Sequence, residues 1–86
     1  MKIYEKTIII NDRYDDYIEK STEFVEAASK FKSEVFIIKE DKLYNGKSII
    51  GVMSIEASDG RELTLRAEGE DAFETVEYLS KIIQSK

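Results

Sequence analysis

The chain contains no histidine, cysteine, proline or tryptophan among its 86 residues. Without histidine or cysteine it has no Ser-His-Asp triad, no thiolate nucleophile and no zinc site of the usual ligand types. It also lacks the side chain whose unperturbed pKa lies nearest neutral pH. Because no acid, base and nucleophile stand at a recognisable spacing, the sequence predicts a protein that is not an enzyme and that needs no cofactor or metal.

Positive charge is also scarce, since 13 Lys and Arg stand against 18 Asp and Glu, giving a net charge of -5. This balance disfavours nonspecific binding to nucleic acid or to an anionic membrane surface. The longest apolar run, Ile8-Ile9-Ile10, is too short to span a membrane. Charged residues within the first six positions interrupt any signal-peptide apolar region. We therefore expect a cytoplasmic protein.

Length and composition predict a single domain covering residues 1–86. Hydrophobic residues make up 42% of the chain, and no linker, repeat or low-complexity stretch divides it. Since there is no disulfide, one modest core has to stabilise the fold alone.

Hydrophobic periodicity predicts strands and helices in the order β-α-β-β-α-β-α. The predicted strands are Ile3 to Ile10, Glu34 to Lys39, a short strand around Leu43-Tyr44, and Arg61 to Glu68. The predicted helices are Asp16 to Phe31, a short helix from a Ser48 cap to Ser54, and a final helix after Asp71. The last strand alternates between an apolar and a polar face, so helices should cover one side of the sheet only.

The residues at the helix ends and the spacing of apolar residues predict how the helices are capped and buried. Asp16 with Glu19, and Asp71 with Glu74, have the three-residue spacing of a capping box. Gly51 lowers helix propensity by about 1 kcal/mol relative to Ala and marks close packing or a weak turn. The apolar stripe expected to bury the final helix is Phe73, Val76, Leu79 and Ile83.

The segment Lys47-Ser48-Ile49-Ile50-Gly51-Val52-Met53-Ser54 is similar to K-S-I-M-G-V-M-S, the regulatory-serine segment of the HPr phosphocarrier family. HPr belongs to the bacterial sugar phosphotransferase system. Ala28-Ser29-Lys30-Phe31 resembles the end of the family's first helix, and Gly69 falls in the same ungapped register. The resemblance covers essentially the whole chain. It implies an α+β open-faced β-sandwich, with a four-stranded antiparallel sheet in the order 1-4-2-3 and three helices on one face.

The family's active-site segment, G-I-H-A-R-P, is replaced here by the six residues from Asp15 to Lys20. In this register Tyr17 occupies the position of the phosphohistidine and Glu19 that of the arginine. A tyrosyl phosphate is a much poorer phosphoryl donor than the phosphoramidate of histidine, and the surrounding carboxylates would repel phosphate. The sequence therefore predicts no phosphoryl relay. Tyr17 is interpreted as a partly buried aromatic in the first turn of the helix, and the acidic cluster around it as solvation of the helix N-terminus rather than a metal site.

By position, Ser48 resembles the serine that HPr kinase/phosphorylase phosphorylates in related proteins. A phosphate there would meet the free N–H groups of a helix N-terminus, although serine is a preferred N-cap even when unmodified. Lys47 would supply positive charge near such a phosphate. Ile49, Ile50 and Met53 resemble the family's partner-docking patch, and some of them are expected to seal the short helix onto the core.

A second candidate surface is the open face of the sheet. Strand alternation predicts that Phe36 and Ile38 point to this face, and that Ile9 joins them from the first strand. Exposed apolar patches often mark association. The alternative is that the three are dispersed surface hydrophobes, because Thr64 and Arg66 lie between the two strands.

Two functions follow from these features. The first is a non-catalytic regulatory or protein-binding module of the sugar phosphotransferase and carbon catabolite system, switched by phosphorylation at Ser48. This arrangement is similar to catabolite repression HPr, a family variant that lacks the histidine, keeps the serine and joins a transcription regulator when phosphorylated. The resemblance implies HPr kinase/phosphorylase and a transcription regulator as partners. The alternative is a repurposed HPr-fold adaptor that forms a homodimer or docks partners through the open sheet face, without phosphate chemistry.

Overall fold

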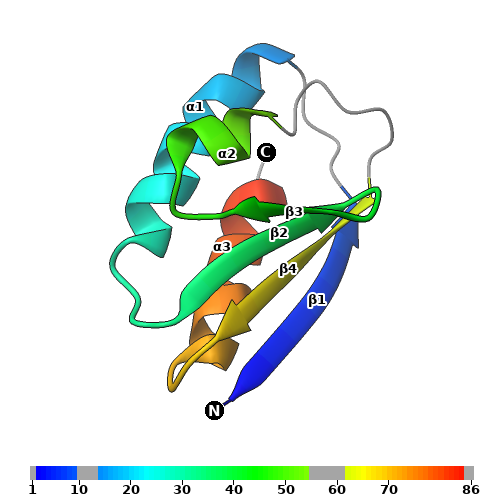
Figure 1. The fold of residues 1–86 in the computed structure, drawn as a ribbon. Helices are drawn as coiled ribbons and strands as arrows, with labels where there is room; N and C mark the ends of the chain where they lie inside the picture. The colour runs from blue at the N-terminus through cyan, green and yellow to red at the C-terminus, as the bar shows by residue number, and fades with distance from the viewer. Residues whose placement is uncertain (1, 10–13, 55–61, 85–86) are drawn as a thin grey trace.

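The computed structural model describes residues 2–9, 14–54 and 62–84, with the backbone alone for residues 14–19. Four strands and three helices follow one another in the predicted order (Figure 1). The strands are β1 (Ile3–Ile9), β2 (Glu34–Lys39), β3 (Lys42–Asn45) and β4 (Glu62–Glu68). The helices are α1 (Tyr14–Ala28), α2 (Ile49–Ser54) and α3 (Ala72–Gln84).

The strands form one antiparallel sheet in the order β1-β4-β2-β3. β1 and β4 pair along their full lengths, from Ile3 opposite Glu68 to Ile9 opposite Glu62. The three helices lie together on one face of this sheet, which leaves the other face open (Figure 1). This arrangement confirms the predicted fold class, strand order and one-sided helix layer.

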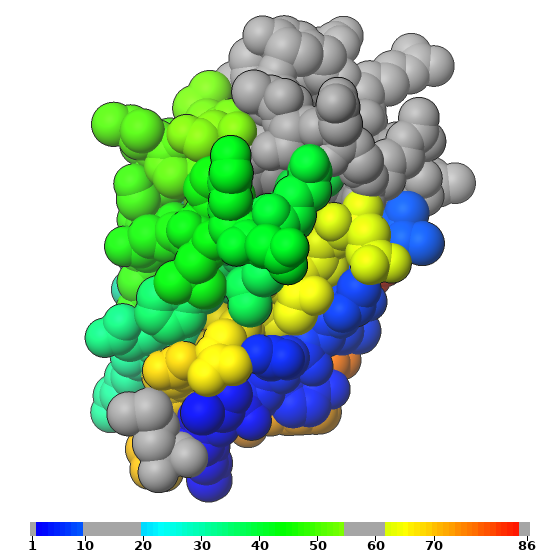
Figure 2. Space-filling view, turned by 45° about the vertical axis from the view of Figure 1, so that its right-hand side comes forward, coloured from blue at the N-terminus to red at the C-terminus, as the bar shows by residue number. Residues whose placement is uncertain are grey.

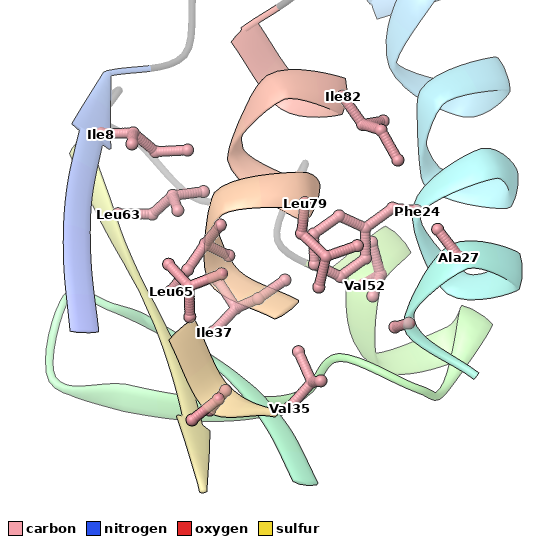
Figure 3. Close-up of a cluster of buried hydrophobic side chains, with 14 residues drawn as sticks. Ile8, Phe24, Ala27, Val35, Ile37, Val52, Leu63, Leu65, Leu79 and Ile82 are labelled. Carbon is pink, nitrogen blue, oxygen red and sulfur yellow. The ribbon is translucent and has the colours of Figure 1, made fainter. Parts of the chain in front are cut away.

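Period-two alternation determines which side chains form the core. In β4, Leu63, Leu65 and Ala67 are buried, and Val35 and Ile37 of β2 are buried in the same way. Figure 3 shows sheet side chains pointing toward the helices, where they meet side chains of all three. The helical residues labelled in this core are Phe24 and Ala27 of α1, Val52 of α2, and Leu79 and Ile82 of α3.

Helix α1 is shifted toward the N-terminus relative to the prediction. It begins at Tyr14, so Asp16 lies inside the first turn and the predicted cap position is wrong. It ends at Ala28 and not at Phe31, because the chain tightens into turns there. The N–H groups of Lys30 and Phe31 bond to carbonyls three residues back, at 3.1 and 3.2 Å.

The predicted stripe of α3 is wrong at Phe73, whose side chain is 55% exposed. Val76 and Leu79 are buried as expected, together with Ala72 and Thr75. Since one residue advances a helix by about 100°, the position after the buried Ala72 points to the flank. There the ring of Phe73 meets that of Tyr4 edge-on, with centroids 4.8 Å apart.

The capping box predicted at the start of α3, which paired Asp71 with Glu74, is also wrong. Asp71 directly precedes the helix, but its carboxylate bonds across the fold to the segment before β2. It accepts hydrogen bonds from the backbone N–H groups of Lys32 and Ser33, both at 2.9 Å, and from the Ser33 hydroxyl at 2.5 Å. The side chain therefore joins the start of α3 to the loop that follows α1.

Candidate functional site

Ser48 occupies the residue before α2, and its side chain caps the helix. The backbone N–H of Gly51 donates to Ser48 Oγ at 3.2 Å, and the N–H of Val52 donates to the Ser48 carbonyl at 2.9 Å. These are the contacts of a serine N-cap, so the predicted cap is confirmed. The side chain is half-buried, which leaves part of it at the surface.

The segment before Ser48 is held in a defined turn. Asn45 Oδ1 accepts a hydrogen bond from the Lys47 N–H at 2.9 Å, and the Asn45 carbonyl accepts one from the Ser48 N–H at 3.2 Å. At Gly51 the helix packs against this turn, because an added Cβ would lie 2.9 Å from the Asn45 carbonyl oxygen. Of the two interpretations of Gly51, close packing is the one that the structure bears out.

The apolar residues of α2 divide between core and surface. Val52 is buried and attaches the helix to the core, whereas Ile50 is 77% exposed. Ile49 is exposed to a smaller extent, and Met53 is half-buried. α2 therefore presents Ile50, flanked by Ile49 and Met53, next to its capped N-terminus.

Lys47 makes a contact that the sequence did not indicate. Its Nζ donates a hydrogen bond to the Phe31 carbonyl at 3.0 Å. That carbonyl lies just beyond the end of α1, where backbone acceptors are left over and a cation is favoured. Lys47 therefore ties the turn before α2 to the end of α1. An ammonium has three donors, so this bond leaves two others.

Tyr17, which the sequence register predicts at the position of the family's histidine, lies near the start of α1. The helix begins at Tyr14, two residues before the predicted start at Asp16, so Tyr17 is its fourth residue. The side chains of Tyr17 and Glu19 lie outside the described part of the structure, and so does the acidic cluster around them.

The open face of the sheet carries the apolar side chains expected there. Phe36 and Ile38 are half-buried, and Ile9 is 55% exposed on the same side. Sequence reasoning missed Leu43, which is 62% exposed and pairs directly with Ile38 across the hairpin. The two-residue turn contained the signal, because it fixes Leu43 opposite Ile38.

Polar and charged side chains separate Ile9 from the other three. Thr7 and Thr64 face each other across β1 and β4 with their Oγ1 atoms 2.9 Å apart. Arg66 bonds to Glu68 at 2.7 Å and to Glu5 at 2.5 Å, and these contacts raise the pKa of Arg66. Figure 2 shows this face, with β1, β4 and the β2-β3 hairpin side by side. The open face thus has an apolar patch of Phe36, Ile38 and Leu43 beside a polar strip, with Ile9 on the far strand.

Among the described residues, no helix is long and apolar enough to cross a membrane. The described side chains also contain no cluster of three or more potential metal ligands.

Comparison with known proteins gives a consistent result. The family model described as "PTS HPr component phosphorylation site" matches residues 4–85. HPr-like protein Crh of Bacillus subtilis is 46% identical over 63 residues, which cover 73% of this chain and 74% of the relative. The crystal structure of HPr-C-His from Thermoanaerobacter tengcongensis has a TM-score of 0.85 at 38% identity, covering 95% of this chain and 92% of that one.

A second solved structure bears on assembly. The crystal structure of Crh from Bacillus subtilis, named there as a catabolite repression protein, has a TM-score of 0.73 at 37% identity. The match covers 92% of this chain and 86% of that chain, and the protein is described as an intertwined dimer with a swapping domain.

Proposed function

The chain belongs to the HPr family, and from that premise we propose that it is a regulatory, protein-binding member and not a phosphocarrier. The sequence contains no histidine, so it cannot form the phosphohistidine on which the family's relay depends. Tyr17 stands in that position and Glu19 in that of the arginine. A member without these groups acts by binding other proteins and is not an enzyme.

Ser48 is proposed as the switch of this binding activity. The observation that carries the proposal is the capped N-terminus of α2, where Ser48 Oγ accepts the Gly51 N–H and Ile50, in the first turn of the same helix, is 77% exposed. A phosphate on Ser48 would add close to two negative charges beside this apolar surface and change which partners it accepts. Lys47, with two donors left after its bond to Phe31, would face that charge.

The proposed partners follow from similarity to Crh. An HPr kinase/phosphorylase would modify Ser48, and a transcription regulator of the carbon catabolite system would bind the product. Ile49, Ile50 and Met53 are the proposed contact residues, and Ile50 is the most exposed of them. The proposed site of action is the cytoplasm, where such partners are found.

Incubation with HPr kinase and ATP, followed by intact-mass measurement, tests this proposal. We expect one added phosphate on the wild type and none on Ser48→Ala. The loss of the cap costs about 1 kcal/mol, so circular dichroism should confirm that the variant is folded. Ser54→Ala, at the exposed end of the same helix, is the matched control and should still be phosphorylated. An unmodified wild type, or phosphate retained by Ser48→Ala, would contradict the switch.

The second candidate function is an adaptor that associates through the open sheet face without phosphate chemistry. It is favoured by the apolar patch of Phe36, Ile38 and Leu43, because Leu43 is 62% exposed with no role in the core. Ile9 would contribute from the opposite side of the face. Sedimentation of the wild type against Phe36→Glu tests this candidate. A wild type that stays monomeric and captures no partner would rule it out.

A further inference from the structure

β1 forms one edge of the sheet and has only part of the protection usual for an edge strand, namely the charged residues Glu5 and Lys6. Among the described strands it pairs only with β4, so the backbone groups on its outer side have no strand partner. Its register with β4 is continuous, without a bulge, and the chain has no proline. Such an edge is a template for pairing with another strand.

One hydrogen bond fixes which residues of β1 face outward. The N–H of Gly69 donates to the Lys2 carbonyl at 2.8 Å, so the backbone groups of Lys2 point toward β4. In an antiparallel strand these directions alternate along the chain. The outward backbone groups therefore belong to Ile3, Glu5, Thr7 and Ile9.

We propose that a second copy of this chain pairs with β1 along this edge, antiparallel and centred on Lys6. The outward backbone groups of one copy must pair with the outward groups of the other. The two-fold axis between the strands must therefore pass through a residue, such as Glu5, Lys6 or Thr7, and not between two residues. Only the centre at Lys6 aligns both strands over the full length from Ile3 to Ile9. The pairing has two-fold symmetry and joins the two sheets with their helices on the same side.

The side chains agree with this register. Centring on Lys6 places Ile3 of each copy opposite Ile9 of the other on the open face, and Glu5 opposite Thr7. Ile3 is 52% and Ile9 55% exposed in the single chain, and each would gain an apolar cross-strand partner. A centre at Glu5 would place Ile3 opposite Thr7. A centre at Thr7 would place Ile9 opposite Glu5. The sequence of β1 is thus self-complementary in one register.

The helix side adds one favourable and one unfavourable contact. Tyr4, already packed against the exposed ring of Phe73, would face Ile8 of the second copy. The two Lys6 side chains would oppose each other at the axis, which is repulsive. Each Lys6 Nζ lies 3.5 Å from its own Glu77 carboxylate, so two acidic groups compensate the two ammonium groups.

This edge pairing differs from a swapped dimer, in which β1 leaves its own β4 and pairs with that of the other copy. It also does not depend on Ser48, so its failure would leave the regulatory proposal intact. It uses the edge of β1 and not the patch of Phe36, Ile38 and Leu43, so the two kinds of association respond to different substitutions.

Sedimentation velocity over a concentration series tests the edge. We expect reversible dimers, weakened about tenfold or more by Ile3→Lys and by Ile9→Lys, because each change occurs twice in the dimer. Leu43→Lys and Ile50→Lys replace apolar side chains that are even more exposed, at 62% and 77%, but lie elsewhere, and they should leave the association unchanged. Lys6→Thr removes both the repulsion at the axis and its compensation by Glu77, and should not weaken the dimer. A wild type that remains monomeric, or a dimer weakened by Leu43→Lys but not by Ile3→Lys, would overturn the proposal.

A cysteine pair distinguishes edge pairing from swapping, since the chain has no cysteine of its own. Thr7 and Thr64 are paired across β1 and β4, at a spacing that suits a disulfide. In the doubly substituted protein, Thr7→Cys with Thr64→Cys, edge pairing predicts a disulfide within one chain. The oxidised protein then runs as a monomer under denaturing conditions, yet sediments as a dimer when native. A covalent dimer would show swapping and would overturn the edge pairing.

Discussion

At the scale of single residues, Asp71 links two parts of the fold that are distant in sequence. Its carboxylate accepts three hydrogen bonds from the segment containing Lys32 and Ser33. The Ser33 hydroxyl, followed by the Lys32 N–H, lowers the pKa of Asp71 from 3.8 to about 2. The ionised form is therefore the one that stabilises the folded state.

Replacing this carboxylate should weaken the fold in a pH-dependent way. We expect Asp71→Asn to lower the free energy of unfolding by about 2 kcal/mol at neutral pH, the usual contribution of hydrogen bonds to a charged group. Because the folded pKa lies below the unfolded value, this stabilisation is present above pH 3.8 and is lost as the pH falls through about 2. Urea unfolding at several pH values measures the difference.

Glu70→Gln is the control for that experiment, since Glu70 is an exposed neighbouring carboxylate. It should leave the stability within experimental error at every pH. Equal stability of Asp71→Asn and wild type at neutral pH would show that the three hydrogen bonds contribute nothing.

Gly69 is the second residue on which this region depends. Its backbone φ of 152° is one that residues other than glycine rarely adopt. A Cβ added at this position would lie 2.8 Å from Ser33 Cα. We expect Gly69→Ala to cost about 2 kcal/mol or more, from backbone strain together with overpacking. Thermal unfolding measures the loss. A melting temperature equal to that of wild type would mean that the loop of Ser33 can move aside freely.

At the scale of elements, alternation and turn chemistry account for most of what the sequence predicted. The bounds of β2 were predicted to the residue, and the buried side of β4 was predicted from its alternating pattern. Lys39 shows how strongly the strand period acts, because this charged residue follows Val35 and Ile37 inward and is buried. Composition alone would have placed it outside.

The errors at this scale arose where distant contacts decide the outcome. The sequence predicted a local cap formed by Asp71 with Glu74. In the fold, the carboxylate of Asp71 instead accepts hydrogen bonds from the loop of Lys32 and Ser33. Phe73 was assigned to the core from spacing, yet the helix is rotated so that Ala72 and Val76 face the sheet. Neither the approach of that loop nor the helix rotation is encoded in a local pattern.

The β2-β3 hairpin contains a turn whose residues suit it poorly. Lys39 pairs with Lys42, so Glu40 and Asp41 form a two-residue turn, with φ values of 52° and 66°. Turns with positive φ at both positions favour Asn followed by Gly. We expect Glu40→Asn with Asp41→Gly to raise stability by about 1 kcal/mol, or about 5 °C in Tm, as measured by thermal unfolding.

Glu40→Gln serves as the control for the hairpin, because it removes one charge without changing the backbone preference. It should have little effect on Tm. If the Asn-Gly turn were no more stable than wild type, strain at the two positive φ values would not limit the stability of this domain.

At the scale of the whole molecule, the chain has the HPr architecture and contains no histidine. The fold depends on sheet alternation and on the helices that cover one face, and the described core takes Phe24, Ala27 and Ala28 from the later part of α1. The resemblance of the α2 segment directed attention to Ser48, and its cap geometry could be predicted from sequence. The place of Leu43 follows from the two-residue turn and the edge position of β1 from the predicted strand order. The bond from Lys47 to Phe31 could not be predicted, because it depends on how two separate elements are placed together.

The most direct test of the central claim is whether this protein accepts a phosphoryl group through the relay. Incubation with phosphoenolpyruvate and the first enzyme of the phosphotransferase system, followed by intact-mass measurement, gives the answer, with a histidine-containing HPr as the positive control. We predict that the mass of this chain stays unchanged while the control gains a phosphate. A phosphorylated product of this chain, lost in a Tyr17→Phe variant, would contradict the account, because Tyr17 would then have kept the role that the histidine has in the family.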